Sequence, residues 1–237
     1  MNLNDLKKNL SDTHFLKILF LRTIGNFLVL LSLFLIVKTF SDPVIEEVKY
    51  VYDRATGKHY ALAGDITFDY GSDRKKGLLA DINKQKIELI KPVDSNFGIV
   101  IPKINANATI VPDVSVTNKD AYLAALKKGV AHASGTAFPG EGGHIFLFAH
   151  STDNFWNVGR YNAIFYLLYK LGSNDEIDLF YKGARYKYIV DTTKIVDPTE
   201  VQYLTRKTKK ETVTLQTCWP PGTTLKRLLI FAKPATN

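Results

Sequence analysis

The pattern of apolar and polar residues divides the chain into one long apolar run, a mixed polar segment and a series of short apolar runs. The apolar run, 23–37, has fifteen residues without a charge, which is short because a helix needs about 20 residues to cross a bilayer. Extending it to 18–40 reaches that length, since the side chains of Arg22 and Lys38 near its ends can extend toward the headgroups. The sequence therefore predicts one transmembrane helix over 18–40.

The flanks of this run predict its orientation. Basic residues outnumber acidic ones on the N-terminal side (Lys7, Lys8, Lys17 and Arg22 against Asp5 and Asp12), and positive charge favours the cytoplasmic side. The stretch KTFSDP after the run lacks a small-x-small cleavage pattern, which favours an uncleaved anchor over a removed signal peptide. We therefore expect a cytoplasmic tail (1–17), the anchor (18–40), a stalk or N-terminal extension (41–95) and an external folded domain (96–237).

The folded domain reads as mainly β. Short β-branched runs at 98–104 and 108–111 are interrupted by Pro102 and Pro112, as in short or edge strands. Further strands are predicted over 144–150, 176–181, 184–191, 212–218 and 227–233. One helix is predicted over 119–128, with Thr117 or Asn118 as its cap and Gly129 as its stop, and a second over 162–171. Many short strands with two short helices favour a barrel or sandwich over a βαβ fold.

Composition and charge narrow the function classes. Hydrophobic residues make up 46% of the 237 and charged residues 23%, which is typical of a globular chain. The net charge is +8, but bases are interleaved with acids, and we find no RNA-binding aromatic motif, zinc finger or basic helix. The sequence therefore predicts no nucleic-acid partner.

The single cysteine, Cys218, excludes an intrachain disulfide. It ends the predicted strand 212–218, and Arg227 opens the next strand, so the two lie close together if these strands pair. A guanidinium beside a thiol favours the thiolate and can stabilise an oxyanion on an attacked carbonyl. The alternative is a buried structural thiol with an unrelated surface arginine.

A histidine is needed to move protons in such chemistry. His150 is the best candidate of the five, because it ends a strand and is followed by polar residues; the others are His14, His59, His132 and His144. His144 and His150 share a face of an unbulged strand and could hold zinc with Cys218. A third or fourth ligand at suitable spacing is lacking, so we expect no metal.

Several segments together resemble the sortase family. The stretch Thr-Leu-Gln-Thr-Cys at 214–218, followed by Arg227, is similar to the family's strand with its catalytic cysteine and the arginine that opens the next strand. GTAFPGEGGHIFLFAH ends at His150, IPKINANATIV matches the opening strand, and LKKGVAHASGTAFPG matches the stretch that follows. The resemblance covers about 97–233. The chain departs from the family at Ala149 (usually Gly), His144 (usually Asn) and Ser151-Thr152 (often Arg), and Asp42-Pro43 lacks the aromatic residue of the pilin-sortase lid.

The resemblance implies a closed eight-stranded barrel and a membrane-anchored cysteine transpeptidase. It implies Cys218 as nucleophile, His150 as acid and base, Arg227 as oxyanion or carbonyl ligand, and Thr217 and Ala149 as substrate contacts. The expected substrate is a secreted protein with a Leu-Pro-x-Thr-Gly-like signal, and the acceptor is an amine of a cell-wall precursor or pilin. No cofactor is required, and a calcium site stays open.

Other classes fit less well. An L,D-transpeptidase normally has a Ser-x-Gly-Cys run, absent from this sequence. A cell-wall amidase usually places its cysteine before its histidine, the reverse of the order here. The remaining alternative is a degenerate sortase-like scaffold or an envelope-binding module, which would keep its function in a Cys218→Ala variant.

Overall fold

The computed structural model describes residues 13–62, 86–151 and 164–235. The chain separates into two compact units, 1–45 and 46–237. The predicted tail (1–17) lies mostly outside the described residues, as do the middle of the predicted stalk and Thr152. The predicted domain boundaries remain predictions.

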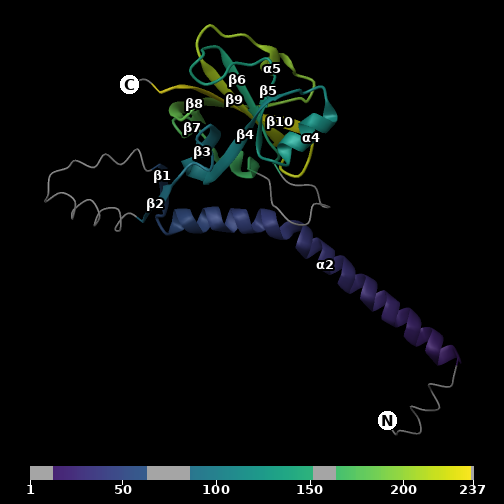
Figure 1. The fold of residues 1–237 in the computed structure, drawn as a ribbon. Helices are drawn as coiled ribbons and strands as arrows, with labels where there is room; N and C mark the ends of the chain where they lie inside the picture. The colour runs from purple at the N-terminus through teal and green to yellow at the C-terminus, as the bar shows by residue number, and fades with distance from the viewer. Residues whose placement is uncertain (1–12, 63–85, 152–163, 236–237) are drawn as a thin grey trace. The chain divides into compact units, whose positions relative to one another are not determined.

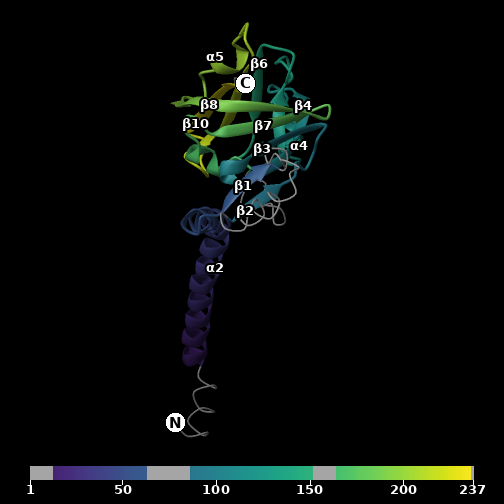
Figure 2. The ribbon, with the colours of Figure 1, turned by 90° about the vertical axis from the view of Figure 1, so that its left-hand side faces the viewer.

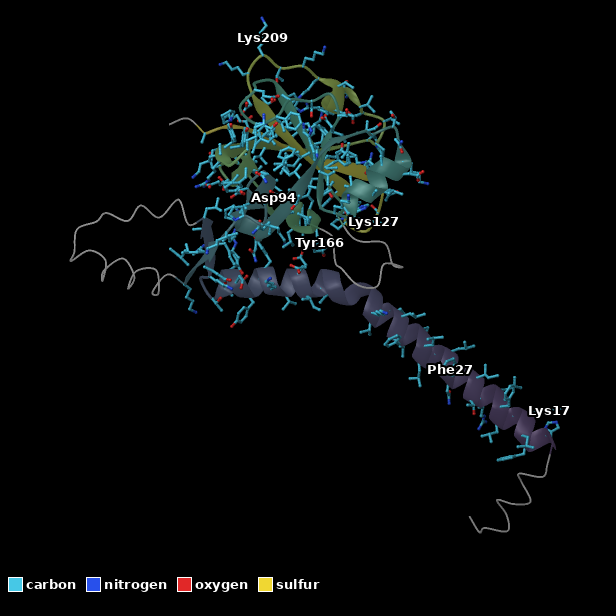
Figure 3. All side chains as sticks on the ribbon, viewed as in Figure 1. Lys17, Phe27, Asp94, Lys127, Tyr166 and Lys209 are labelled. Carbon is cyan, nitrogen blue, oxygen red and sulfur yellow. The ribbon has the colours of Figure 1, made fainter. Side chains whose placement is uncertain are left out.

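The first unit consists of the N-terminal part of helix α2 (Thr13–Ala55). Its stretch His14–Lys38 is long and apolar enough to cross a membrane by length and composition, and none of it is buried in protein. Figure 3 shows the side chains of Lys17 and Phe27 standing on the exposed helix. This is the one candidate span in the described part of the chain, and it coincides with most of the predicted anchor.

The second unit contains a closed barrel of eight strands (Figures 1 and 2). They are β3 (Phe97–Ile101), β4 (Ala106–Val114), β5 (Val130–Ala133), β6 (His144–Phe148), β7 (Glu176–Tyr181), β8 (Ala184–Val196), β9 (Thr212–Trp219) and β10 (Lys226–Pro234). Their order around the barrel is β10-β8-β7-β3-β4-β5-β6-β9, and β9 closes it by pairing with β10. The predicted closed eight-stranded barrel is confirmed.

Alternation along the strands separates the inside of the barrel from its outer face. In β6, Ile145 and Leu147 belong to the main core, whereas Phe146 and Phe148 belong to a second cluster with Leu126. Leu126 ends helix α4 (Lys119–Leu126), which connects β4 to β5. Because successive side chains of a strand point to opposite faces, α4 covers the outer face beside β6.

Both predicted signals around α4 are confirmed. The side chain of Asn118 accepts hydrogen bonds from the backbone N–H groups of Asp120 and Ala121, as an N-cap does. Gly129 follows the helix, and a Cβ at this position would lie 2.3 Å from the carbonyl oxygen of Thr109. No side chain fits there, which explains why a glycine follows the helix.

The described parts of 46–95 pack against the barrel. Strands β1 (His59–Leu62) and β2 (Ile87–Ile90) pair in parallel. Leu62 and Ile90 form a small apolar cluster with Val100 of β3 and Phe180 of β7. The sequence predicted no elements in this segment, because each run is only four residues long.

Four further elements differ from the prediction. The helix predicted over 162–171 is a 3₁₀ helix, η2 (Tyr166–Lys170), and 162–163 lie outside the described residues. Strand β5, which was not predicted, contains His132, and this side chain is fully buried. The short helices η1 (Pro102–Ile104) and α5 (Gln202–Thr205) were not predicted.

Candidate active site

The register between β9 and β10 places Cys218 directly opposite Arg227. Directly opposed residues of antiparallel strands point to the same face, with Cβ atoms about 4.5–5.5 Å apart. The main core contains Leu215, Leu228 and Ile230, which lie an odd number of positions from Cys218 or Arg227 on the same strands. The side chains of Cys218 and Arg227 therefore point to the opposite, outer face. Cys218 as a residue is only partly buried.

The parallel pairing of β6 with β9 brings His150 to the same place. This register pairs Phe148 with Gln216, and it continues one step further, because the N–H of Ala149 donates to the carbonyl oxygen of Gln216 at 3.2 Å. Carried on past the end of β6 (His144–Phe148), the same register would set His150 opposite Cys218. The register thus brings the three predicted catalytic residues to the ends of three adjacent strands, and their roles remain predictions.

Thr217 and Ala149 join these two strands from the inner side. Both are buried, at 4% and 6% exposure. The hydroxyl of Thr217 donates to the carbonyl oxygen of Ala149 at 3.0 Å. The bond ties the residue before the nucleophile to the residue before the histidine. The predicted contacts of Thr217 and Ala149 with substrate remain predictions.

The guanidinium of Arg227 is oriented by the turn that precedes β10. Its Nη1 donates to the carbonyl oxygens of Thr224 and Lys226, each at 3.0 Å. These bonds hold the guanidinium at the start of β10, on the residue that pairs with Cys218. A fixed cation at this point is suited to an oxygen that gains negative charge.

Tyr122 of α4 faces the same place and was not singled out in the sequence. Its ring stacks on Phe148, with centroids 5.1 Å apart and an interplanar angle of 12°. Burial raises the pKa of the Tyr122 phenol, the nearby Cys218 raises it further, and the guanidinium of Arg227 lowers it. The sequence signal was an aromatic residue on the predicted helix, but which strands that helix covers is set by tertiary packing.

His144 and His132 do not join the site. Nε2 of His144 lies 2.9 Å from the hydroxyl of Thr214. Nε2 of His132 lies 3.0 Å from the carbonyl oxygen of Ala137. Burial lowers the pKa of both histidines, that of His144 to about 4 with a further contribution from Arg206. Within the described residues no three His, Cys, Asp or Glu side chains gather in a way that could hold a metal.

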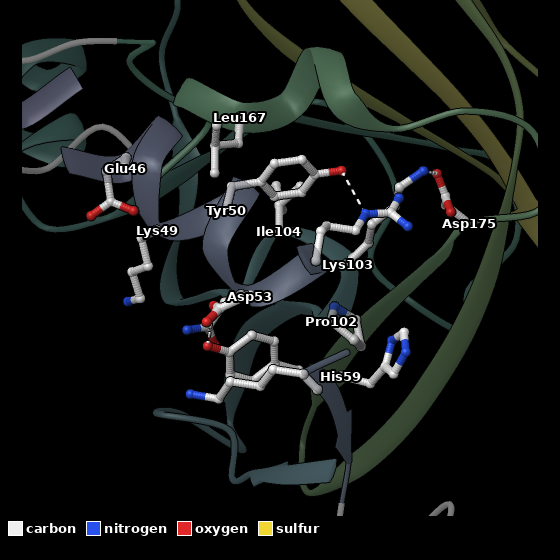
Figure 4. A pocket seen from close by; sticks show the side chains of 14 residues that line it. Glu46, Lys49, Tyr50, Asp53, His59, Pro102, Lys103, Ile104, Leu167 and Asp175 are labelled. Carbon is white, nitrogen blue, oxygen red and sulfur yellow. Dashed lines mark hydrogen bonds and ion pairs between the residues drawn. The ribbon is translucent and has the colours of Figure 1, made fainter. Parts of the chain in front are cut away.

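A cavity of about 370 Å³ lies away from the thiol, between the C-terminal part of α2, β1 and η1 (Figure 4). Charged side chains that line it have partners within the protein. Lys103 bonds Asp175 at 2.7 Å, and Nε of Arg54 donates to the hydroxyl of Tyr50 at 3.2 Å. We therefore interpret it as a polar joint between α2 and the barrel rather than as a reaction site.

A series of contacts connects α2 with Trp219, the residue that follows Cys218. Glu47 accepts a hydrogen bond from the hydroxyl of Tyr169 and forms an ion pair with Lys170 at 3.1 Å. The ring of Tyr169 in turn packs against Trp219, with centroids 5.4 Å apart. The end of β9 is thus supported by η2, and η2 by α2.

Comparison with known proteins agrees with this geometry. A family model described as the sortase domain matches residues 99–235. Sortase D of Bacillus subtilis (strain 168) is 32% identical over 160 residues, which are 66% of this chain and 72% of that protein.

Solved sortase structures also resemble the chain. Sortase C1 of GBS Pilus Island 1 is 27% identical with a TM-score of 0.50, and the match covers 60% of this chain and 65% of that one. Sortase C-1 from Actinomyces oris is 25% identical with a TM-score of 0.50, and the match covers 70% and 83%. The chain thus spans slightly less than two thirds of the first of these structures. With the closed barrel and the family match over 99–235, this chain belongs to the sortase family, whose members are cysteine transpeptidases.

Proposed function

We propose that this sortase cuts a Leu-Pro-x-Thr-Gly-like sorting signal and transfers the cut protein to an amine of the cell envelope or of a pilin. The observation that supports it best is the strand register that sets Cys218 opposite Arg227 and pairs β6, which leads into His150, with the strand of Cys218. These residue types, in this arrangement, can attack an amide, stabilise the oxygen that becomes negative, and protonate the departing amine.

In the first half-reaction, the Cys218 thiolate attacks the carbonyl carbon of the scissile amide. A carbon–sulfur bond forms, and the carbonyl oxygen gains negative charge beside Arg227. The carbon–nitrogen bond then breaks, and His150, as imidazolium, gives its proton to the leaving amine. The acyl part stays on the enzyme as a thioester, and His150 is left neutral.

In the second half-reaction, an incoming amine attacks the thioester carbonyl. Neutral His150 takes a proton from that amine, and the carbon–sulfur bond breaks to return the thiolate. The product is a new amide, and the imidazolium is regenerated. No redox change occurs, and none of these steps requires a cofactor.

The location follows from the anchor. We propose that residues 18–40 cross the cell membrane once, with the N-terminus in the cytoplasm. The excess of bases before the span supports this orientation, and His14–Lys38 supports the span itself. The barrel would then meet secreted substrates and envelope amines on the external side.

Acyl capture tests the proposal. Full-length protein in detergent micelles is mixed with a panel of Leu-Pro-x-Thr-Gly-like peptides, with and without a glycine-peptide amine. Intact-protein mass spectrometry should find an acyl adduct on Cys218 that the amine discharges. Cys218→Ala should form none, while Cys218→Ala and the unmodified protein keep the same thermal midpoint.

A thiol that alkylates readily but accepts no peptide would argue against this substrate class. A thiol that neither alkylates nor acylates would overturn the enzymatic proposal in favour of a scaffold.

A further inference from the structure

We propose that Tyr122 is a catalytic residue of this site. Its ring shields the Cys218 thiol, and its hydroxyl, jointly with Arg227, donates a hydrogen bond to the oxygen of the carbonyl group that Cys218 attacks. The hydroxyl part rests on the proposed function. The ring part concerns access to Cys218 and holds whatever the substrate is. Neither part follows from the three residues that the family resemblance points to.

The position of Tyr122 is fixed from two sides. Helix α4 packs its Ala125 and Leu126 into the apolar cluster on the outer face of the barrel. The Tyr122 ring lies nearly parallel to that of Phe148 at 5.1 Å, and Phe148 stands two residues before His150 on the same face of β6. The ring therefore borders the outer face where His150 and Cys218 stand.

The phenol of Tyr122 lies within electrostatic range of two residues of the site. The electrostatic neighbours of the phenol are Cys218 and Arg227, which sit opposite one another on β9 and β10. Burial, the larger cause, raises the pKa of the Tyr122 phenol, so the hydroxyl keeps its proton throughout the neutral range. A protonated phenol in this position can donate a hydrogen bond to an oxygen that gains negative charge.

The proposed role is strongest when the carbonyl is under attack. The oxygen of a bound amide is only weakly basic, whereas the oxygen of the tetrahedral adduct carries negative charge and attracts donors more strongly. Arg227 approaches from β10 and Tyr122 from α4, so the two donors would reach the oxygen from opposite sides of the thiol. The same pair would act again when an amine attacks the thioester.

The chain offers a matched control in Tyr203. Its ring packs against Phe231 of β10 at 5.8 Å, and its hydroxyl accepts a hydrogen bond from Lys194. It is thus another outer-face tyrosine resting on a strand phenylalanine. Its hydroxyl, unlike that of Tyr122, is bonded to a surface lysine.

The hydroxyl is tested by single-turnover acylation of the full-length protein in micelles. Tyr122→Phe should slow acylation on the order of 100-fold, at the lower end of what removal of one oxyanion donor costs. Tyr203→Phe should stay within about twofold of the unmodified protein, a change of less than about 0.5 kcal/mol at 1.4 kcal/mol per tenfold. Equal rates for Tyr122→Phe and the unmodified protein overturn the hydroxyl's role and leave the proposed function standing.

The ring is tested without substrate, by the rate at which N-ethylmaleimide modifies Cys218. Tyr122→Ala should raise this rate about threefold or more, because it exposes the Cys218 thiol. Tyr122→Phe and Tyr203→Ala should leave the rate unchanged. Circular dichroism confirms that each variant is folded. If no peptide acylates the unmodified protein, the proposed function fails. The alkylation rates alone still test whether the Tyr122 ring shields Cys218, and an unchanged rate in folded Tyr122→Ala overturns that shielding.

Discussion

At the scale of single residues, Arg227 has a geometry that lysine cannot reproduce. Its Nη1 makes two bonds to turn carbonyls while the guanidinium stays beside Cys218. A lysine ammonium is a compact charge on a flexible stem, without a planar fork.

We therefore expect Arg227→Lys to lower the acylation rate on the order of 100-fold, because the charge is kept but its direction is lost. Lys226→Met is the matched control, since the ammonium of Lys226 bonds the exposed Asp197 at 2.6 Å and the substitution keeps the backbone carbonyl that Arg227 contacts. Single-turnover kinetics with the best peptide of the panel measure both variants. A rate within threefold of the unmodified protein for Arg227→Lys would show that charge alone suffices.

Thr217 carries a second residue-scale prediction. Thr217→Val keeps the shape of the side chain but leaves the carbonyl oxygen of Ala149 without its buried donor. This should lower the free energy of unfolding by about 1–3 kcal/mol and slow acylation by loosening the spacing of Cys218 and His150. Urea unfolding measures the first effect. Thr212→Val, at a less buried position of the same strand, is the control, and an equal loss in both variants would contradict the argument.

The sequence predicted some of this site and not the rest, for a physical reason. Cys218 and Arg227 flank one turn, so strand spacing alone brings them together. His150 belongs to a strand distant in sequence, and its choice among five histidines depended on its strand-end position and on the family resemblance. Tyr122 joins only because α4 packs across β6, a contact with no local signal.

At the scale of elements, η2 transmits contacts from α2 to the end of β9. Its Tyr169 bonds Glu47 on one side and packs against Trp219 on the other. Tyr50 adds to the same joint, with the ammonium of Lys170 5.2 Å from its ring centroid. The C-terminal part of α2 therefore supports the residue that follows the nucleophile.

This support is tested by the fluorescence of Trp219 in a Trp156→Phe background, where Trp219 is the one tryptophan of the chain. Tyr169→Ala should shift the emission to longer wavelength, because it removes the ring that shields the indole. Tyr169→Phe keeps the ring and loses only the bond to Glu47, so its emission should change little. Identical spectra for all three proteins would show that the contact does not shield Trp219.

The elements themselves were predictable to different degrees. Strands with a long apolar run, such as 144–150 and 227–233, were found within one or two residues of their ends. Strand β5 was not predicted, because its four residues are too short a run to reveal the period of a strand. In η2 the apolar spacing fitted a helix, but the chain forms one 3₁₀ stretch there.

At the scale of the whole molecule, buried neutral histidines make stability depend on pH. Burial and then the charge of Arg206 lower the pKa of His144 to about 4, compared with about 6.5 in an unfolded chain. Between these values the unfolded chain binds a proton that the folded chain does not. The stability is therefore fully present above about pH 6.5 and is lost as the pH falls toward 4.

We expect the free energy of unfolding to fall by up to about 1.4 kcal/mol per pH unit from this histidine alone over that interval. His144→Gln can still bond the hydroxyl of Thr214 but does not titrate, so its stability should depend less on pH. Urea titrations at pH 7, 6 and 5 measure the difference. Parallel curves for the two proteins would rule out His144 as a source of the acid sensitivity, and the buried His132, whose pKa is also lowered, would be substituted next.

The order of the strands in the sequence also governs when the proposed enzyme can first act. A chain that is synthesised and exported from its N-terminus presents Tyr122 first, then His150, then Cys218 and finally Arg227. Strand β10 brings the last of these and also joins β8 to β9, so one late strand both closes the barrel and completes the site. A nascent chain stalled before β10 therefore carries a thiol without its guanidinium partner in an unclosed fold. On the proposed mechanism, acylation would therefore begin only after the chain has grown through β10.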